Sequence, residues 1–251
     1  MPNVSAEHPV IQLWSSHHPQ HGYPPGVEPV PEPISGLAFF PGGWGLWRTP
    51  SDMAMPALPI NGTMVLGHDF HSRRGYDESF RRGGERLTLP TWRNLLVVLR
   101  DADIPPESCF FTNLYMGLRS GDKTTGIFPG APDDRFRRHC QDFLLKQLSV
   151  QRPRLVITLG MQVPPVIAEL SDQLTPWITE RGIRKIDEAG ALRTHVTFRQ
   201  LPGFTTTVVA LLHPSLRHAS LRHRTYRGRR GLEAERALLR DAVVESEMGV
   251  V

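Results

Sequence analysis

Three polar residues with complementary chemistry follow separate apolar runs of the chain: Asp69, Asn113 and His213. A carboxylate can act as a base or stabilise a cation, and a carboxamide donates and accepts hydrogen bonds at once. An imidazole can donate to a developing negative charge. Each residue taken alone is typical of a turn or a helix cap. Only a shared position in the fold would make the three a site.

The apolar runs before these residues predict buried strands. Each run is short and rich in β-branched or aromatic residues. The expected strands cover residues 63–66, 108–112, 155–159 and 205–212. Helical patterns separate them, over residues 91–102, 133–148, 163–170 and 232–247. Continuous apolar strands that alternate with helices indicate a parallel sheet covered on both faces. Ligands bind beyond the carboxyl ends of such strands, so the three polar residues are expected to converge there.

Composition narrows the class of protein. The chain has 251 residues, of which 39% are hydrophobic and 22% charged, as in a globular protein. No apolar run approaches the roughly 18 residues that span a bilayer, and the N-terminus lacks the pattern of a secretory signal. The only cysteines are Cys109 and Cys140, which favours a reducing cytoplasmic setting and excludes a four-cysteine cluster within the chain.

The charge balance favours an anionic partner. The net charge is +4, and only three of the 29 basic residues are lysines. Arginine binds phosphates with two parallel hydrogen bonds and stacks on bases, which suggests nucleic acid. A GC-rich genome, which favours arginine codons, explains the same bias.

The first 34 residues differ from the rest of the chain. They contain eight prolines and four histidines, and proline at this density interrupts helices and sheets. We therefore divide the chain into a proline-rich arm, residues 1–34, and a globular domain, residues 35–251. The arm is expected to wrap partly on the domain or to be disordered. An aromatic and glycine-rich stretch, residues 39–47, is expected to pack the arm onto the domain, with stacking on single-stranded DNA as the alternative.

Three motifs together resemble the uracil-DNA glycosylase superfamily. Gly67-His68-Asp69-Phe70-His71 stands where its best-known branch has Gly-Gln-Asp-Pro-Tyr-His after the first core strand. Thr112-Asn113 matches the asparagine that closes a later strand, and His213-Pro214-Ser215 matches the last motif without change. The run 155–160 also looks like the third strand of that superfamily. The resemblance covers roughly residues 60–230 and implies a three-layer α/β/α fold with a central four-stranded parallel sheet.

The resemblance implies a role for each motif residue. Asp69 corresponds to the aspartate that positions the attacking water, and His213 to the donor for the carbonyl oxygen of the departing base. Asn113 corresponds to the residue that reads the base edge. The backbone and side chains of Gly67, His68, Phe70 and His71 would line the base pocket. Phe80 is the preferred residue to stack on the extracted base, and Phe70 is its rival.

The segment after the last motif is strongly basic. Ser215 and then Leu216 or Arg217 match the loop that enters the minor groove and fills the gap left by the extracted base. The arginines behind this wedge could hold phosphates, namely Arg222, Arg224, Arg227, Arg229 and Arg230. The alternative is a solvated basic face that leads into the last helix.

The first motif departs from the family pattern. Phe70 replaces a proline, and His71 replaces the tyrosine that blocks the methyl group of thymine, so exclusion of thymine is open. The superfamily branches with an iron–sulfur cluster need four cysteines, so this chain would fall in a cluster-free branch. Two histidines beside a carboxylate could also ligate a metal. His68 and Asp69 would point to opposite faces of a strand, however, so neither a metal nor another cofactor is expected.

The resulting hypothesis is a monofunctional DNA glycosylase that removes uracil or a related deaminated base in base excision repair. It would act on DNA as a monomer in the cytoplasm, or at the nucleoid in a bacterium. One alternative is a non-catalytic DNA- or nucleic-acid-binding member of the same fold, suggested by the altered first motif. The other is a hydrolase of free nucleosides or nucleotides. The glycines between 117 and 130 lack the ending of a phosphate-binding loop and predict a loop flanking the pocket.

Overall fold

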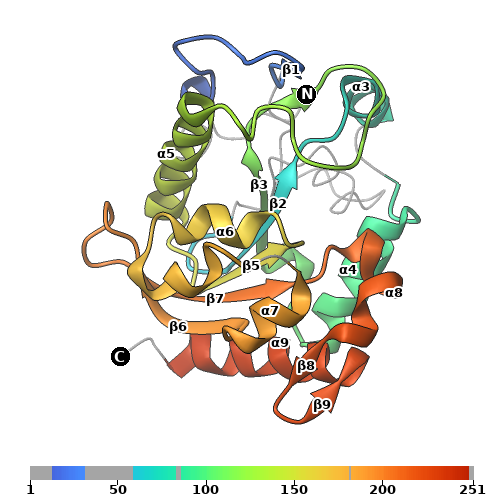
Figure 1. Ribbon diagram of the computed structural model, residues 1–251, viewed down its shortest axis with the longest axis vertical. Helices are drawn as coiled ribbons and strands as arrows, with labels where there is room; N and C mark the ends of the chain where they lie inside the picture. The colour runs from blue at the N-terminus through green and yellow to red at the C-terminus, as the bar shows by residue number, and fades with distance from the viewer. Residues whose placement is uncertain (1–12, 32–58, 83–85, 181, 249–251) are drawn as a thin grey trace.

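A mixed five-stranded sheet lies between two layers of helices (Figure 1). This computed structural model describes residues 13–31, 59–82, 86–180 and 182–248. The sheet has the strand order β3-β2-β5-β7-β6. Its strands are β2 (Thr63–Asp69), β3 (Cys109–Tyr115), β5 (Leu155–Leu159), β6 (Leu192–Thr197) and β7 (Thr205–Leu211). The three-layer α/β/α class is confirmed, and the four strands predicted from the sequence are the four parallel ones.

The four predicted helices are present with ends shifted by at most three residues. They are α4 (Pro90–Asp101), α5 (Asp134–Gln151), α6 (Val163–Ala168) and α9 (Gly231–Met248). The start of α5 shows how such a shift of one residue arises. Asp133 is not the first residue of the helix but its N-cap, and its side chain accepts the N–H groups of Arg135 and Phe136, both at 2.9 Å. The sequence did not predict three further helices, α3 (Arg73–Arg82), α7 (Ile183–Glu188) and α8 (Arg217–Ser220).

Short elements complete the described part of the chain. The short 3-10 helices are η1 (Trp14–Ser16), η2 (Pro106–Ser108), η3 (Asp172–Trp177), η4 (Pro214–Leu216) and η5 (Leu221–His223). The two-residue strands are β1 (Val27–Glu28), β4 (Leu118–Arg119), β8 (Thr225–Tyr226) and β9 (Arg229–Arg230).

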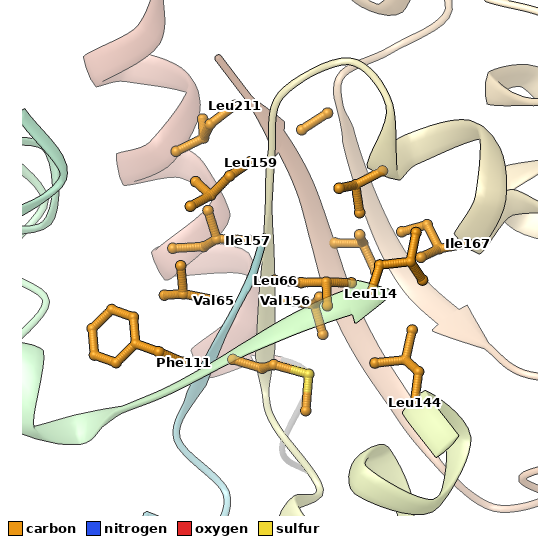
Figure 2. Packing of buried hydrophobic residues seen from close by; sticks show 14 of the residues in the cluster. Val65, Leu66, Phe111, Leu114, Leu144, Val156, Ile157, Leu159, Ile167 and Leu211 are labelled. Carbon is orange, nitrogen blue, oxygen red and sulfur yellow. The ribbon is translucent and has the colours of Figure 1, made fainter. Parts of the chain in front are cut away.

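The core forms on both faces of the sheet because successive strand residues alternate between them. Figure 2 shows Val65, Phe111 and Ile157 on one side of the strands. Leu66 and Leu114 lie on the other side, with side chains from α5 and α6. All seven residues of β3 are buried, as expected for a strand covered on both faces.

The fifth strand was missed because its sequence has no continuous apolar run of the kind that predicted the other four. β6 runs antiparallel to β7 at the edge of the sheet, and most of its residues are only partly buried or exposed. A bulge interrupts its pairing between Arg193 and Val196, and His195 has a left-handed backbone with φ of 51°. An edge strand with a bulge needs no continuous apolar pattern.

The described part of the N-terminal arm is packed on the domain. Trp14, His17 and Val30 are buried, and the His17 ring lies within hydrogen-bonding distance of the carbonyls of Trp14 and Val30. Further along, β1 pairs with β4, which puts Val27 opposite Arg119. Residues 13–31 are therefore part of the folded unit, whereas the aromatic stretch 39–47 lies outside the described residues.

Both cysteines are buried, unpaired thiols. Burial raises the pKa of Cys109 and of Cys140 to about 12, so neither thiol is an activated nucleophile. Within the described residues, no helix combines the length and the apolar character needed to cross a bilayer.

Candidate functional site

The sheet register brings Asp69 and His213 to the same edge. Leu66 of β2 pairs with Thr158 of β5, and Thr158 pairs with Ala210 of β7. Asp69 and His213 each lie three positions beyond this transverse row, at the carboxyl ends of their strands. The Asp69 carboxylate is close enough to favour a higher pKa for His213, against the larger lowering effect of burial. The expected convergence of these two residues is therefore present.

Asp69 is a buried carboxylate with four protein donors. Its side chain is 9% exposed. His68 Nδ1 lies 2.8 Å from Oδ2, and the His71 N–H donates to Oδ1 at 3.0 Å. Arg119 donates to both oxygens, at 3.3 Å to Oδ1 and 2.8 Å to Oδ2. Burial alone would raise the pKa of Asp69, but the hydrogen bonds from His68 and Arg119 hold it well below its usual range.

The contact between His68 and Asp69 corrects one expectation. The two side chains were expected to diverge, as neighbours on a strand do. Asp69 is the last residue of β2, however, and the chain turns at once through His71, whose φ is 78°. The turn lets the His68 ring reach Asp69. The same ring makes T-shaped contacts with the rings of Tyr115 and Phe128. Because an ionised carboxylate only accepts hydrogen bonds, His68 Nδ1 carries the proton.

His213 is half-buried and presents one ring nitrogen to the site. Its Nδ1 accepts the Ser215 N–H at 3.3 Å and lies 2.8 Å from Ser215 Oγ. Nε2 forms no hydrogen bond with a described residue. Burial lowers the pKa of His213, against the opposing effect of Asp69. The ring is therefore neutral near pH 7, with its proton on Nε2, and can donate a hydrogen bond.

Two residues outside the motifs fix the position of His213. Gly160 follows β5 with φ of 84°, and a Cβ there would lie 3.2 Å from the Cβ of His213. Glycine at this position leaves room for the last motif beside β5. Asn94 of α4 donates from Nδ2 to the carbonyl of Pro214 at 2.8 Å. Sequence reasoning did not assign Asn94, because a polar residue on an amphipathic helix carries no signal of a partner 120 positions away.

Asn113 lies inside a strand, not after one. It is the fifth residue of β3, pairs with Gly67 of β2 in the parallel register, and is 4% exposed. Its carboxamide makes no hydrogen bond with a described residue, so it retains donors and an acceptor for a ligand. Asn113 lies two positions nearer than Asp69 to the transverse row, which places it deeper along the strands.

The aromatic residues near the first motif differ in exposure. Phe70 is 1% exposed, whereas Phe80 on α3 is 44% exposed and stacks on Tyr76 at 6.1 Å between ring centroids. His71 has an exposed residue surface, but its ring lies over Gly75, where a Cβ would come within 2.1 Å of Nδ1. Burial of the ring lowers the pKa of His71, and Arg119 adds to this effect against the charge of Asp69.

Two arginines expected at a DNA surface are instead buried in the protein. Arg224 is 0% exposed and forms ion pairs with Asp187 at 3.2 Å and Glu235 at 3.9 Å. Arg217 donates from Nε to Glu235 at 2.8 Å and is also buried. Arg224 is therefore corrected from a phosphate contact, and Arg217 from a candidate wedge, to structural ion pairs. The sequence cannot show this, because their acidic partners lie in other elements.

The remaining residues of that segment are exposed. Leu216 is 61% exposed, directly after the motif with His213, and Ser215 is exposed beside it. Arg222 is exposed, and the Arg227 side chain is 68% exposed despite its ion pair with Asp241. Leu216 ends η4, Arg222 lies in η5 and Arg227 lies between β8 and β9, so these residues remain accessible candidates for a contact with DNA.

Arg119 is the principal site residue that sequence analysis missed. It belongs to the short strand β4, is 3% exposed, and forms two hydrogen bonds with Asp69. Its position between Leu118 and Ser120 gives no indication of a partner 50 residues earlier. Among the described residues, no group of three or more histidine, cysteine or acidic side chains could hold a metal ion.

No protein-family model matches the chain, and a search of curated proteins gives no significant match.

Proposed function

We propose that this protein is a monofunctional DNA glycosylase that hydrolyses the N-glycosidic bond of uracil or a related deaminated base. The observation that carries the proposal is the convergence of Asp69 and His213 at one edge of the sheet, with Asn113 deeper along the neighbouring strand. An anion, a neutral donor and a two-way hydrogen-bonding group suit a reaction that charges the sugar positively and the departing base negatively.

Each group would serve one part of that reaction. The carboxylate of Asp69 is held ionised, so it can stabilise the cationic sugar and align the attacking water. The Nε2–H of His213 can donate to the carbonyl oxygen of the departing base; one such donor contributes about 3–4 kcal/mol. Asn113 can accept the N3–H of uracil and donate to O4. The base would have to leave the DNA stack to reach these groups.

The exposed loop gives this proposal its DNA partner. Leu216 is exposed three positions after His213, and Arg222 and Arg227 are accessible further along the chain. An apolar side chain that enters the base stack and arginines that bind phosphates are a common combination in proteins that distort DNA. A hydrolase of free nucleosides would have no use for such a loop.

The test is a glycosylase assay on fluorescent oligonucleotides that carry uracil, hypoxanthine, xanthine or thymine opposite guanine. Single and double strands are treated with protein and then with alkali, which cleaves at abasic sites. Asp69→Asn is the inactive comparison. Asp172→Asn is the matched control, since Asp172 also accepts two hydrogen bonds from one arginine, Arg199, but is exposed. We expect cleavage at one base or a few bases, lost only in Asp69→Asn. Equal cleavage by both variants would overturn the assigned mechanism.

A second candidate follows from the pairing of Asp69. All four of its donors come from the protein itself, which lowers the basicity of the carboxylate and occupies both oxygens. This observation favours a protein that binds damaged DNA without cleaving it. Binding of uracil-containing or abasic DNA, with no alkali-labile product from any tested base, would support this candidate over the glycosylase.

A further inference from the structure

One buried arginine is shared between the Asp69 carboxylate and an exposed loop. Arg119 binds both oxygens of Asp69, as described above. The same guanidinium donates to three successive carbonyls, those of Thr125 at 3.2 Å, Gly126 at 2.8 Å and Ile127 at 3.1 Å. All three of its nitrogens are therefore engaged, and its planar geometry matches two sets of acceptors at once.

The backbone of Arg119 is fixed as firmly as its side chain. Its N–H donates to the carbonyl of His71 at 2.9 Å, next to the turn that follows Asp69. Strand β4 pairs with β1, which puts Arg119 opposite Val27 of the N-terminal segment. The guanidinium also lies over the Phe128 ring, 5.5 Å from its centroid. Three segments that are distant in the sequence thus meet at this residue.

The charges explain why the arrangement depends on a cation. The carboxylate of Asp69 and the carbonyls of 125–127 are all hydrogen-bond acceptors, and acceptors repel one another without a donor between them. Arg119 lies between them and satisfies both sets. Gln162, which follows β5, adds a weaker link to the same loop through Gly126, at 3.5 Å. Residues 120–127 are otherwise exposed, so few other contacts fix them.

We propose that Arg119 is a positioning residue of this site, which orients the Asp69 carboxylate and fixes loop 120–127 against the end of β2 as one unit. The catalytic consequence rests on the proposed glycosylase function, whereas the coupling of loop and carboxylate does not. The guanidinium of Arg119 donates to the Asp69 carboxylate on one side and to the carbonyls of residues 125–127 on the other. Its loss is therefore expected to slow bond cleavage with little effect on DNA affinity.

The first experiment separates rate from binding. Single-turnover cleavage and DNA affinity are measured for Arg119→Gln, Arg119→Lys and the matched control Arg199→Gln. Arg199 lies between β6 and β7, at the opposite end of the parallel strands, and also donates to a carboxylate, that of Asp172, and to a carbonyl, but it is half-exposed. We expect a loss in rate of about 100-fold for Arg119→Gln, with affinity within about threefold. Arg119→Lys keeps the positive charge but loses the forked geometry of the guanidinium donors. We expect its cleavage rate to be about tenfold higher than that of Arg119→Gln. The control is expected to match the wild type.

The second experiment does not depend on activity. Carbon-13 NMR follows the titration of the Asp69 carboxyl, and hydrogen exchange follows the amides of residues 120–127. In Arg119→Gln we expect the pKa of Asp69 to rise by about 1–3 units and the loop amides to exchange faster. If that variant does not fold, Arg119→Lys takes its place in both measurements.

The outcomes distinguish the two proposals. A wild-type protein that cleaves no base overturns the glycosylase, and the titration and exchange then decide the coupling alone. A folded Arg119 variant with an unchanged Asp69 titration and unchanged loop exchange overturns the coupling. An active enzyme whose rate is unaffected by Arg119→Gln overturns the positioning role. Supporting results are a slower rate, a raised pKa and faster loop exchange together, with the control unchanged.

Discussion

The two ends of the candidate site are built in opposite ways. At the end of β2, Asp69 is nearly buried and accepts hydrogen bonds from three residues, one of them Arg119. Beyond β7, His213 is half-buried, with Nδ1 satisfied by Ser215 and Nε2 without a described partner. The first end fixes a charge in place, and the second keeps a donor available. This difference indicates which group is oriented in advance and which one meets the ligand.

The basic segment repeats the same contrast within a few residues. Arg224 is fully buried between Asp187 and Glu235, whereas Arg227 is largely exposed and pairs with Asp241. Burial lowers the pKa of the Arg224 guanidinium and raises that of Asp187. A run of similar residues in the sequence is therefore divided by the fold into structural ion pairs and accessible cations.

The largest effect is expected from Asp69→Asn. Removing the fixed charge should lower glycosylase activity by about 1,000-fold or more, because the cationic sugar loses its counter-charge. It should also destabilise the fold by about 3–5 kcal/mol, since Arg119 remains buried without its carboxylate. Urea denaturation and single-turnover assays measure the two effects separately. Undiminished activity in a folded variant would show that the end of β2 is purely structural.

The second prediction tests the available donor. His213→Ala should reduce the cleavage rate by about 100- to 1,000-fold, the usual loss for one donor to a developing oxyanion. Because His213 makes fewer protein contacts than Asp69, its replacement should cost much less stability. His18→Ala is the control, since the Nδ1 of His18 is also within hydrogen-bonding distance of one local hydroxyl, that of Tyr23, but His18 is exposed in the N-terminal segment and has no role in the proposed site. A comparable loss in both variants would contradict a direct role for the imidazole.

The third prediction separates the two kinds of arginine. The double variant Arg222→Gln/Arg227→Gln should weaken DNA binding and reduce the slope of log affinity against log salt by about 1–2. Its activity on free nucleosides, if present, should be unchanged. Arg224→Gln should instead leave Asp187 and Glu235 buried without their cation and lower stability by about 3–5 kcal/mol. A lower salt slope in a folded Arg224→Gln protein would reverse our assignment.

The smallest effect concerns a buried histidine away from the site. Burial lowers the pKa of His17 below its ordinary value of 6.5. The unfolded chain takes up a proton near pH 6.5, whereas folded His17 resists it until a lower pH. Its contribution to stability is therefore complete above pH 6.5 and decreases as the pH falls toward the lowered folded pKa, by up to about 1.4 kcal/mol per pH unit.

Urea denaturation between pH 5 and 8 measures this dependence in the wild type and in His17→Gln. The variant should show a shallower decrease below pH 6.5, while the decrease due to His213 should persist in both proteins. An identical slope in the two proteins would show that His17 is protonated equally in the folded and unfolded chains.

We could predict from the sequence the parallel strands, the principal helices and the edge at which Asp69 and His213 meet. These follow from local patterns: apolar runs that suit buried strands, and polar residues at the points where those strands end. The prediction that Asn113 closes a strand was wrong, because Asn113 lies inside β3. The strand continues through two more buried residues, and the polar side chain of Asn113 gave no sign of this.

Contacts that form only in the folded protein separate the charges that stabilise the fold from those that remain accessible. Arg119 reaches Asp69 across 50 positions, and Arg217 reaches Glu235 across 18. The edge strand β6 is likewise defined by pairing with β7 and not by its own pattern. The physical reason is common to all three: the partner of a buried charge, or of an edge strand, is set by packing between distant segments, and no local pattern of residues records it.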